Sequence, residues 1–326
     1  MTFAGSPDRV ESRLVPEAGF ELDTFSISGF PRRLGFGLLR ALVRAARAPF
    51  ACLRILRRRS PDVVLGGGGY VAGPMVLAAR IRGVPAALTE ADAHLGLANR
   101  LAAPLARRVF LAYEIPGRDG SKYRVVGRPI PRDHLGAERA ASRDALGLPQ
   151  DRPVLAVFGG LAGAQALNEF VVETYGDAGP ALLHIAGERD YAALRAKVTR
   201  SDYVLLATAR RFGEALAAPD LAISRAGGTV WELAATGTPT ILVPYPHATG
   251  DHQRLNALHF ERGGGAIVVP QEELGRVTTL VSELLADRER LRRMSGAMQA
   301  LARPDAAIEI ADELVRLASA RRGTQV

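Results

Sequence analysis

The sequence predicts an α/β protein of two lobes, each a doubly wound parallel sheet, that face a central cleft. Its length of 326 residues fits two domains of about 150 residues each. Short apolar runs alternate with helical patterns in both halves of the chain, as they do in repeated βαβ units. Glycine-rich loops follow several of these runs, and the loops after parallel strands are where such folds bind ligands.

Apolar runs in the first half predict four buried strands, over residues 62–66, 85–89, 108–112 and 123–127. Five runs in the second half predict strands over 154–158, 181–186, 203–207, 220–224 and 240–244. From about residue 275 the pattern is helical, with a break at Pro304. Prolines and glycines mark a boundary between the halves. We expect an N-terminal lobe over residues 1–130, a linker over 131–150, a C-terminal lobe over 151–303 and a helix with a tail over 304–326.

The composition is that of a globular protein in a reducing compartment. With 48% hydrophobic and 23% charged residues, the chain has enough apolar side chains to exclude a disordered class. Its single cysteine, Cys52, excludes an internal disulfide. Charges interrupt the first residues, and no apolar run reaches the roughly 18 residues of a spanning helix. The sequence therefore predicts a cytoplasmic protein that does not cross a membrane by itself.

The net charge of +8 is concentrated in the first half of the chain. Residues 1–150 contain 23 Lys and Arg against 13 Asp and Glu, whereas residues 151–326 contain 19 against 21. A basic half suits an anionic partner, such as a phospholipid surface or a phosphate-bearing substrate. Residues 30–59 mix apolar residues with arginines at helical spacing, which fits either a helix lying on an anionic membrane or a sheet-covering helix with a solvated arginine face. Nucleic acid is not an expected partner, because no recognised binding module accompanies the charge.

The first glycine loop, Gly66 to Gly69 followed by Tyr70, lies between a predicted strand and a helix expected to begin near Pro74. Its free backbone amides could bind an anion at the helix N-terminus. A tight strand-to-helix turn is the alternative interpretation.

Two glycine loops in the second half also connect a strand to a helix. One is Gly159-Gly160-x-x-Gly163, and the other runs from Ser224 through Gly227, Gly228 and Thr229 to Glu232. Bare amides suit a diphosphate, and a carboxylate one turn into the helix could accept hydrogen bonds from a ribose diol. The alternative is that Thr229 caps the helix and Glu232 is a solvated carboxylate.

A polar cluster follows the strand expected to end at residue 244, and it contains His247, Asp251, His252, Gln253 and Asn256. Gln253 and Asn256 are three apart on a predicted helix and share a face, where amide side chains suit sugar hydroxyls. A metal site is not expected, because the histidines and the aspartate span a loop-to-helix junction with no hydrolase motif.

Two further carboxylates, Glu90 and Asp92, follow the strand expected over residues 85–89. They could form a metal-binding pair, supply a general base, or cap a helix that starts near Leu95. Capping is the simplest interpretation for Asp92 and is less suited to Glu90.

Six ordered motifs, taken together, resemble the peptidoglycan N-acetylglucosaminyltransferases of glycosyltransferase family 28. They are Asp62-Val-Val-Leu-Gly-Gly-Gly-Gly-Tyr-Val-Ala-Gly-Pro, Glu90 with Gly96-Leu-Ala-Asn-Arg, Val125-Val-Gly-x-Pro, Gly159-Gly-x-x-Gly-Ala-Gln-Ala-Leu-Asn, Ser224-Arg-Ala-Gly-Gly-Thr-Val-x-Glu-Leu and His252-Gln-x-x-Asn-Ala. The resemblance implies a GT-B fold and an inverting transfer of GlcNAc from UDP-GlcNAc to undecaprenyl-diphospho-N-acetylmuramoyl-pentapeptide (lipid I). The product would be lipid II, made by a protein that is peripheral on the inner face of the cell membrane.

The resemblance also implies roles for individual residues, with no metal and no cofactor. It implies acceptor binding by Gly68, Gly69, Tyr70 and Asn99, and a catalytic role for Glu90, with a general base deprotonating the acceptor's 4-hydroxyl. Donor binding is implied for Asp92, Gly159, Gly160, Gly163, Arg225, Gly227, Gly228, Thr229, Val230, Glu232, His252 and Gln253.

The chain departs from the family pattern in three places. The family's first βα unit, with its Gly-Gly-Thr-Gly-Gly-His loop, is not found, and we expect a start site placed too late or an inactive protein. The family's Glu-Gln-Asn is Glu90-Ala-Asp92 here, and its Gly-Gly-Ser-Gln-Gly-Ala is Gly159-Gly-Leu-Ala-Gly-Ala. These departures leave three alternatives: a glycosyltransferase with another lipid or small-molecule acceptor, a UDP-GlcNAc 2-epimerase, or an inactive UDP-sugar binder.

Overall fold

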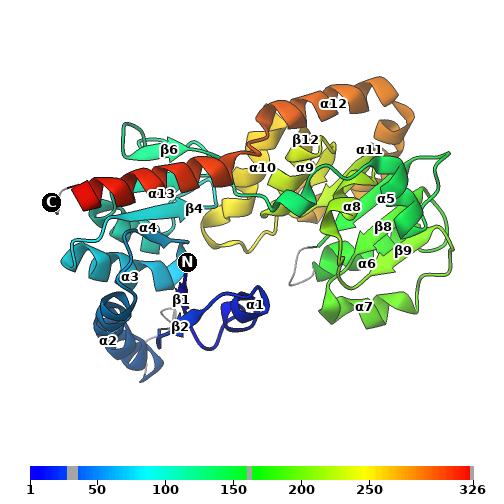
Figure 1. Cartoon of the computed structure of the whole chain (residues 1–326). Helices are drawn as coiled ribbons and strands as arrows, with labels where there is room; N and C mark the ends of the chain where they lie inside the picture. Colours follow the sequence, from blue (N-terminus) through cyan, green and yellow to red (C-terminus); the bar gives the residue numbers. More distant parts are fainter. Residues whose placement is uncertain (28–35, 160–163, 324–326) are drawn as a thin grey trace. The chain divides into compact units, whose positions relative to one another are not determined.

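The computed structural model describes residues 1–27, 36–159 and 164–323, which form two compact units (Figure 1). Unit 1 comprises residues 1–126 and 308–326, and unit 2 comprises residues 127–307. The chain enters unit 2 at Gly127, whose φ of +84° and close approach to Arg303 leave no room for a Cβ atom. Residues 131–150, expected as a linker, belong to unit 2 and contain η2 (Arg132–His134) and α5 (Arg139–Leu146).

The described strands of unit 1 form two parallel sheets. The larger has the order β3-β4-β5-β6, made of β3 (Val64–Gly66), β4 (Ala86–Glu90), β5 (Arg108–Leu111) and β6 (Tyr123–Val125). These are the four strands that the apolar runs predict. The smaller sheet pairs β1 (Phe3–Gly5) with β2 (Leu22–Thr24).

Two long helices, one from each end of the sequence, contribute to the core of unit 1. Helix α2 (Phe36–Arg59) packs on α3 (Gly69–Ile81), and their buried residues join a core that contains Cys52, Val76 and Leu88. Helix α13 (Ala306–Gly323) contributes Ile310 to a second cluster with Phe110. The remaining helices of the unit are α1 (Glu11–Glu17), α4 (Leu97–Ala102) and η1 (Ala103–Leu105).

One helix start differs from the prediction. The helix expected near Pro74 begins at Gly69, because Gly68 and Gly69 adopt φ of +90° and +65° and turn the chain directly from β3 into α3. Among the described helices, none combines the length and the apolar character that crossing a membrane requires.

Unit 2 is a doubly wound parallel sheet. Its strands are β7 (Val154–Phe158), β8 (Ala181–Ile185), β9 (Tyr203–Leu206), β10 (Leu221–Ser224), β11 (Thr240–Leu242) and β12 (Ala266–Val268). Their order in the sheet is β12-β11-β10-β7-β8-β9, with all neighbours parallel. The connections therefore reverse direction between β7 and β10, which is the switch point where this topology binds ligands. The sequence analysis did not predict β12, of which one residue is buried and two are partly buried.

Helices connect and cover these strands. They are α6 (Gln165–Tyr175), α7 (Glu188–Arg195), α8 (Phe212–Ala217), α9 (Thr229–Ala235), η3 (Thr249–Asp251), α10 (His252–Arg262), η4 (Gln271–Glu273), α11 (Gly275–Ala286) and α12 (Arg288–Leu301). The prediction of helix from residue 275 onward, broken near Pro304, is confirmed by α11, α12 and α13.

Candidate functional site

A cavity of about 670 Å³ lies in unit 2 at the carboxyl ends of β7 and β10. Phe158 and Ser224, the last residues of the two strands, are directly paired across the sheet and both line the cavity. The other lining residues are Gly159, Ala164, Gln165, Ala166, Glu169, Arg189, Arg225, Gly227, Gly228, Thr229, Tyr245, Gln253 and Gln271. The cavity therefore occupies the switch point of the doubly wound sheet and has the size of a small-molecule site.

The loop from Arg225 to Gly228 presents backbone amides to this cavity. Gly228 is the N-cap of α9, and no described atom lies within 4 Å of the place that a Cβ of Gly227 would occupy. The first amides of a helix have no partner within the helix, so they are free to bind an anionic group. Thr229 follows the cap, which means that the predicted capping by Thr229 is wrong.

The buried side chain of Asn256 stabilises this loop through a hydrogen bond to its backbone. Its side chain is 1% exposed, and its Nδ2 donates a hydrogen bond to the carbonyl oxygen of Ala226 at 3.1 Å. The expectation that Asn256 presents its amide to sugar hydroxyls is therefore wrong, because α10 turns this residue toward the loop backbone.

Arg225 is buried in the wall of the cavity, where its side chain joins neighbouring segments by hydrogen bonds. Its guanidinium donates to the carbonyl oxygens of Val243 and Pro244 at 3.1 and 3.3 Å and to Gln271 Oε1 at 2.6 Å. It also lies over the ring of Tyr245, 5.6 Å from the ring centre. Burial lowers the pKa of Arg225 from its ordinary value. Arg225 therefore ties the loop after β11 to η4 and leaves few of its N–H groups for a ligand.

Glu232 lies one turn into α9 and is bridged to a residue that the sequence analysis missed. Its Oε1 is 2.8 Å from Nδ1 of His134, and both side chains are largely buried. The His134 ring packs against Phe212, which in turn contacts Phe158. No local sequence signal points to His134, because it lies 98 residues before its partner. Val230, two residues before Glu232, is fully buried and is not among the residues that line the cavity.

His252 and Gln253 are the first two residues of α10, and of the two Gln253 lines the cavity. Gln253 Oε1 accepts a hydrogen bond from the backbone amide of Tyr245 at 2.9 Å, and Gln253 lines the cavity. His252 Nδ1 is 2.9 Å from the carbonyl oxygen of Thr249, and His252 is not among the lining residues. Within the described ranges, no three His, Cys, Asp or Glu side chains converge as metal ligands would.

The loop after β7 is described only in part. Gly159 packs so closely that a Cβ there would stand 3.1 Å from the amide of Ala164 and 3.2 Å from Asn168 Oδ1. Gly160 and Gly163, two predicted donor-binding residues, lie outside the described residues. The floor of the cavity also includes Glu169 and Arg189, which no motif indicated.

A buried hydrogen-bond chain supports this floor. Asn168 Nδ2 donates to the carbonyl oxygen of Ala186 and to Asp190, so its Oδ1 is the atom that accepts from His184 Nε2 at 3.0 Å. His184 Nδ1 consequently accepts from the Tyr203 hydroxyl at 2.8 Å. Burial lowers the pKa of His184 to about 3 and raises that of Tyr203, so these two side chains are neutral at physiological pH. Arg189 holds the pKa of Asp190 below its usual range.

Unit 1 has its own polar cluster at the carboxyl end of β4. Glu90 is 8% exposed, and its Oε2 accepts hydrogen bonds from the backbone of Gly96 and from Asn99 Nδ2, both at 2.9 Å. Its Oε1 lies 3.3 Å from the backbone amide of Asp92. Asp92 does not cap the helix as expected, because α4 begins after Gly96 and has no side-chain cap. Glu90 instead stabilises the loop between β4 and α4, because its carboxylate accepts hydrogen bonds from the backbone of that loop.

The first glycine loop lies beside this cluster. A Cβ at Gly68 would be 3.6 Å from both Asn99 Nδ2 and the carbonyl oxygen of Thr89, whereas Gly67 and Gly69 have no described atom within 4 Å of that position. Tyr70 follows at the start of α3, with the Arg9 guanidinium 5.5 Å from its ring centre. Open backbone thus adjoins Asn99.

Comparison with known proteins identifies the family. Residues 2–111 match the glycosyltransferase family 28 N-terminal domain, and residues 154–310 match the glycosyltransferase family 28 C-terminal domain. The chain belongs to glycosyltransferase family 28. The cavity of unit 2 and the Glu90 cluster of unit 1 lie within the matched ranges, whereas His134 lies between these ranges.

Individual relatives agree with this assignment to glycosyltransferase family 28. A UDP-N-acetylglucosamine--N-acetylmuramyl-(pentapeptide) pyrophosphoryl-undecaprenol N-acetylglucosamine transferase from Clavibacter michiganensis subsp. michiganensis is 41% identical over 329 residues, which cover 98% of this chain and 88% of the relative. The crystal structure of Acinetobacter baumannii MurG matches with a TM-score of 0.76 and 27% identity, covering 97% of this chain and 90% of that one. Family 28 membership confirms the predicted GT-B fold and makes the chain a glycosyltransferase.

A UDP-GlcNAc 2-epimerase from Neisseria meningitidis, bound to UDP-GlcNAc, shares the fold with a TM-score of 0.61. Its identity to this chain is 13%, with coverage of 97% of this chain and 99% of that one. The likeness is therefore one of architecture.

Proposed function

We propose that the chain transfers GlcNAc from UDP-GlcNAc to lipid I and so forms lipid II in peptidoglycan synthesis. The observation that carries the proposal is the cavity at the switch point of unit 2, lined by a glycine loop that opens a helix, in a chain 41% identical to a transferase of that name. The epimerase alternative has weaker support, because that likeness rests on 13% identity.

The donor is expected to bind in unit 2. The amides of Gly227, Gly228 and Thr229 face the cavity and suit the diphosphate, since a helix N-terminus carries partial positive charge. Gln253 lines the same cavity, and a side-chain amide suits sugar hydroxyls as donor and acceptor. Glu232 keeps one carboxylate oxygen on His134, and its other oxygen is assigned to the ribose diol.

The acceptor is expected to bind in unit 1. Gly67 and Gly69 expose backbone that a diphosphate can approach closely, and Asn99 lies beside Gly68. The proposed acceptor is an undecaprenyl-diphosphate-linked sugar, whose charge suits the basic first half of the chain.

The reaction has three requirements. A proton is removed from the acceptor's 4-hydroxyl, its oxygen attacks the anomeric carbon with inversion, and the charge that develops on UDP is stabilised. Amides of the Gly227–Thr229 turn supply the last of these as fixed dipoles, and the proposal therefore includes no metal and no cofactor. Glu90 was expected to be catalytic, and general base was one of the roles left open for it. Since both of its oxygens accept hydrogen bonds from the loop, we assign it the positioning of that loop and of Asn99.

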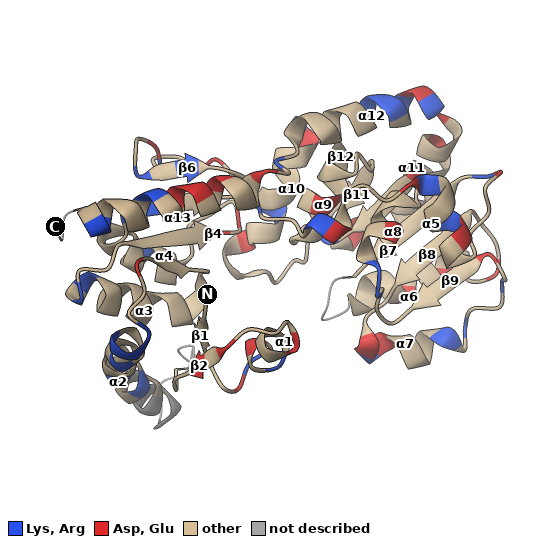
Figure 2. Ribbon diagram, viewed as in Figure 1, with Lys and Arg blue, Asp and Glu red and all other residues tan. Residues whose placement is uncertain are grey.

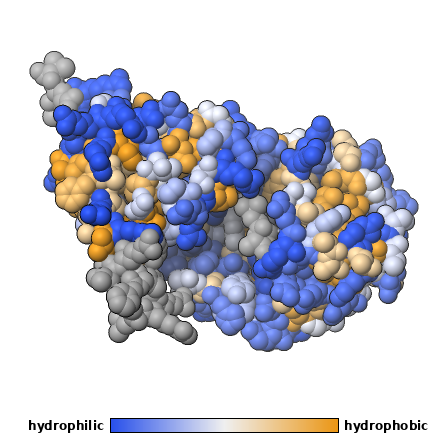
Figure 3. Space-filling model, turned by 90° about the horizontal axis from the view of Figure 1, so that it is seen from below, coloured by the Kyte–Doolittle hydropathy of each residue, from blue (hydrophilic) through white to orange (hydrophobic). Residues whose placement is uncertain are grey.

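We also propose that the protein is peripheral on the inner face of the cell membrane, bound through α2. One face of this helix is buried and includes Cys52 and Leu56. The opposite face carries an exposed stripe at helical spacing, in which two apolar residues alternate with arginines: Val43, Arg47, Phe50, Arg54 and Arg57. Figure 2 shows the basic residues along α2, and Figure 3 shows apolar patches beside hydrophilic surface on the unit 1 side. Apolar insertion flanked by cations is typical of binding to anionic lipid.

The experiment that tests the enzymatic proposal is an assay of UDP release. We expect UDP to form only when UDP-GlcNAc and lipid I are both present. Release of ManNAc from UDP-GlcNAc alone would establish the epimerase instead. UDP binding without turnover on any acceptor would establish a non-catalytic binder, and turnover on another lipid in place of lipid I would reassign the acceptor.

A further inference from the structure

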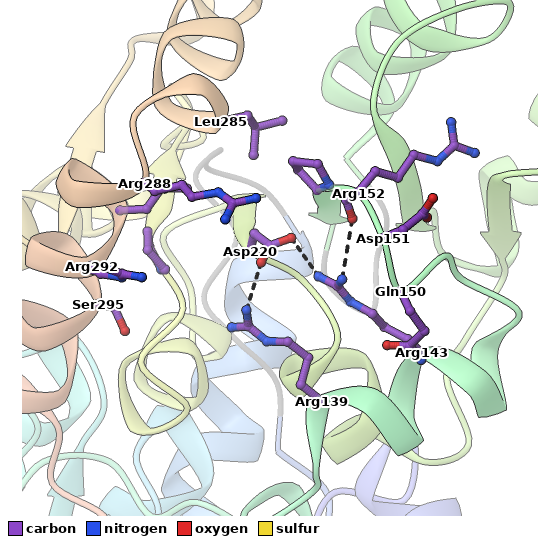
Figure 4. A pocket seen from close by; sticks show the side chains of 13 residues that line it. Arg139, Arg143, Gln150, Asp151, Arg152, Asp220, Leu285, Arg288, Arg292 and Ser295 are labelled. Carbon is purple, nitrogen blue, oxygen red and sulfur yellow. Dashed lines mark hydrogen bonds and ion pairs between the residues drawn. The ribbon is translucent and has the colours of Figure 1, made fainter.

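A second pocket in unit 2 lies at the ends of the strands opposite to the donor cavity. Figure 4 shows the residues that line this pocket. Its volume is about 360 Å³. Pro153, Asp220 and Pro239, which line it, immediately precede β7, β10 and β11. The pocket therefore lies at the amino ends of the three central strands, whereas donor binding is proposed at their carboxyl ends.

Five arginines line this pocket, and they come from separate segments. Arg139 and Arg143 lie on α5, Arg152 precedes β7, and Arg288 and Arg292 lie on α12. The acidic lining residues are Asp151 and Asp220. Arg152 also pairs at 2.8 Å with Asp202, which lies outside the lining, so an excess of two positive charges remains around one small pocket and favours an anionic ligand.

Asp220 and Arg143 form a rigid floor. Arg143 is 5% exposed and donates to Asp220 Oδ2 at 2.6 Å and to the carbonyl oxygen of Ala218 at 2.8 Å. Asp220 also accepts from the backbone of Val154 and from Arg139, both at 2.8 Å. This carboxylate is therefore fully engaged, and it does not neutralise the arginines of the opposite wall.

Arg288 and Arg292 form the wall of the pocket opposite Asp220, and they provide the main evidence for a ligand. Arg288 and Arg292 are exposed, four residues apart on one face of α12, and no described carboxylate pairs with either. Like charges at this spacing destabilise a helix. Their neighbours on the same helix do find partners: Arg293 pairs with Glu289 at 2.7 Å and Arg290 with Glu283 at 4.0 Å. Of the four arginines on α12, the two without a described carboxylate partner are the two that line the pocket.

We propose that this pocket binds a small organic phosphate. The guanidinium groups of Arg288 and Arg292 would hold the phosphate by paired N–H donors, facing Arg139 across the pocket. The apolar part of the lining suits the carbon skeleton of the ligand and consists of Pro153, Pro239, Leu285 and Leu291. The site is distinct from the donor cavity, with which it shares no lining residue.

The test uses fructose 1,6-bisphosphate as the probe and calorimetric titration as the readout. No nucleotide is added, because UDP is itself an organic phosphate that the pocket could bind, and the salt is held at about 150 mM to screen diffuse attraction. We expect saturable binding of one probe per chain. The double variant Arg288→Ala/Arg292→Ala should bind at least about tenfold more weakly, because it loses two charge-assisted contacts.

A matched control lies on the same helix. Arg290→Ala/Arg293→Ala removes the same charge from α12 at residues outside the pocket, and it should bind the probe like the wild type. All four side chains are on the surface of α12, so both variants should melt at nearly the same temperature. Absence of saturable binding in the wild type, or equal weakening in the two double variants, would overturn the proposal.

Discussion

The side-chain amide of Asn99 donates to Glu90 Oε2 and to the carbonyl oxygen of Thr89, both at 2.9 Å. One nitrogen thus joins α4 to the last two residues of β4, next to the open backbone of the first glycine loop. Glu90 accepts hydrogen bonds from the loop between them, and we therefore interpret this carboxylate as a group that positions the loop.

This anchoring predicts different results for two substitutions of Glu90. Glu90→Gln keeps an oxygen for Gly96 and Asn99, so kcat should stay within about tenfold of the wild type. Glu90→Ala leaves buried donors without a partner and should lower kcat by about 100-fold through misplacement of the loop. Steady-state kinetics measures both, with the Kd of UDP unchanged as the control. If Glu90→Gln is as inactive as Glu90→Ala, Glu90 is the base.

Gly227→Ala should separate donor binding from folding. No described atom lies near the place its Cβ would occupy, so the free energy of unfolding should change little. The added methyl group enters the donor cavity, and the affinity for UDP should fall at least about tenfold. Gly296→Ala is the matched control, since this glycine of α12 is equally unobstructed and lies outside the cavity. Equal UDP affinity in the two variants would place the diphosphate elsewhere.

Glu232→Ala should weaken UDP binding by about tenfold through loss of the ribose contact. The decisive comparison is with 2′-deoxy-UDP. The wild type should prefer UDP, whereas Glu232→Ala should bind the two nucleotides with similar affinity. His134→Ala should reduce the preference in part, because the carboxylate loses the partner that orients it at 2.8 Å. Glu214→Ala, a partly exposed carboxylate paired with Arg211 in the same unit, serves as the control. An unchanged preference in Glu232→Ala would remove Glu232 from the ribose site.

His184 should make unit 2 less stable in acid. Its folded-state pKa of about 3 lies below the ordinary value of 6.5, chiefly because of burial, so the unfolded chain binds a proton between these limits and the native chain does not. Stability is complete above about pH 6.5 and is lost as the pH falls toward 3, by about 2 kcal/mol at pH 5. Urea unfolding followed by the fluorescence of Trp231, the single tryptophan, reports this unit. The loss between pH 8 and 5 should be smaller in His184→Gln; an identical pH profile in both proteins would contradict the assignment.

Membrane binding should depend on the exposed stripe of α2. Phe50→Ser, or loss of the charges at Arg47, Arg54 and Arg57, should reduce co-sedimentation with vesicles that contain phosphatidylglycerol. Removing three charges from unit 2, at Arg276, Arg290 and Arg293, controls for net charge alone and should have a smaller effect. Equal losses in the two triple variants would mean that binding follows overall charge.

Local patterns in the sequence determined the repeated strand-loop-helix units. Buried parallel strands appear as short apolar runs, and glycines mark the turns after β3, β7 and β10, because both signals depend on neighbouring residues. The fold class, nine of the strands and the loop that opens into the donor cavity could therefore be predicted. Short strands such as β12, with mixed exposure, carry too little of this signal.

Only the tertiary structure decided which polar side chains meet. His134 reaches Glu232 across 98 residues, Asn256 turns toward Ala226 and away from a ligand, and the basic pocket gathers segments from residue 139 to residue 295. Such contacts follow from the order of strands in the sheet, β12-β11-β10-β7-β8-β9, which brings distant segments to the same edge. A residue's spacing along the chain carries no information about that order, so the partners of Glu232 and Asn256 are properties of the folded protein alone.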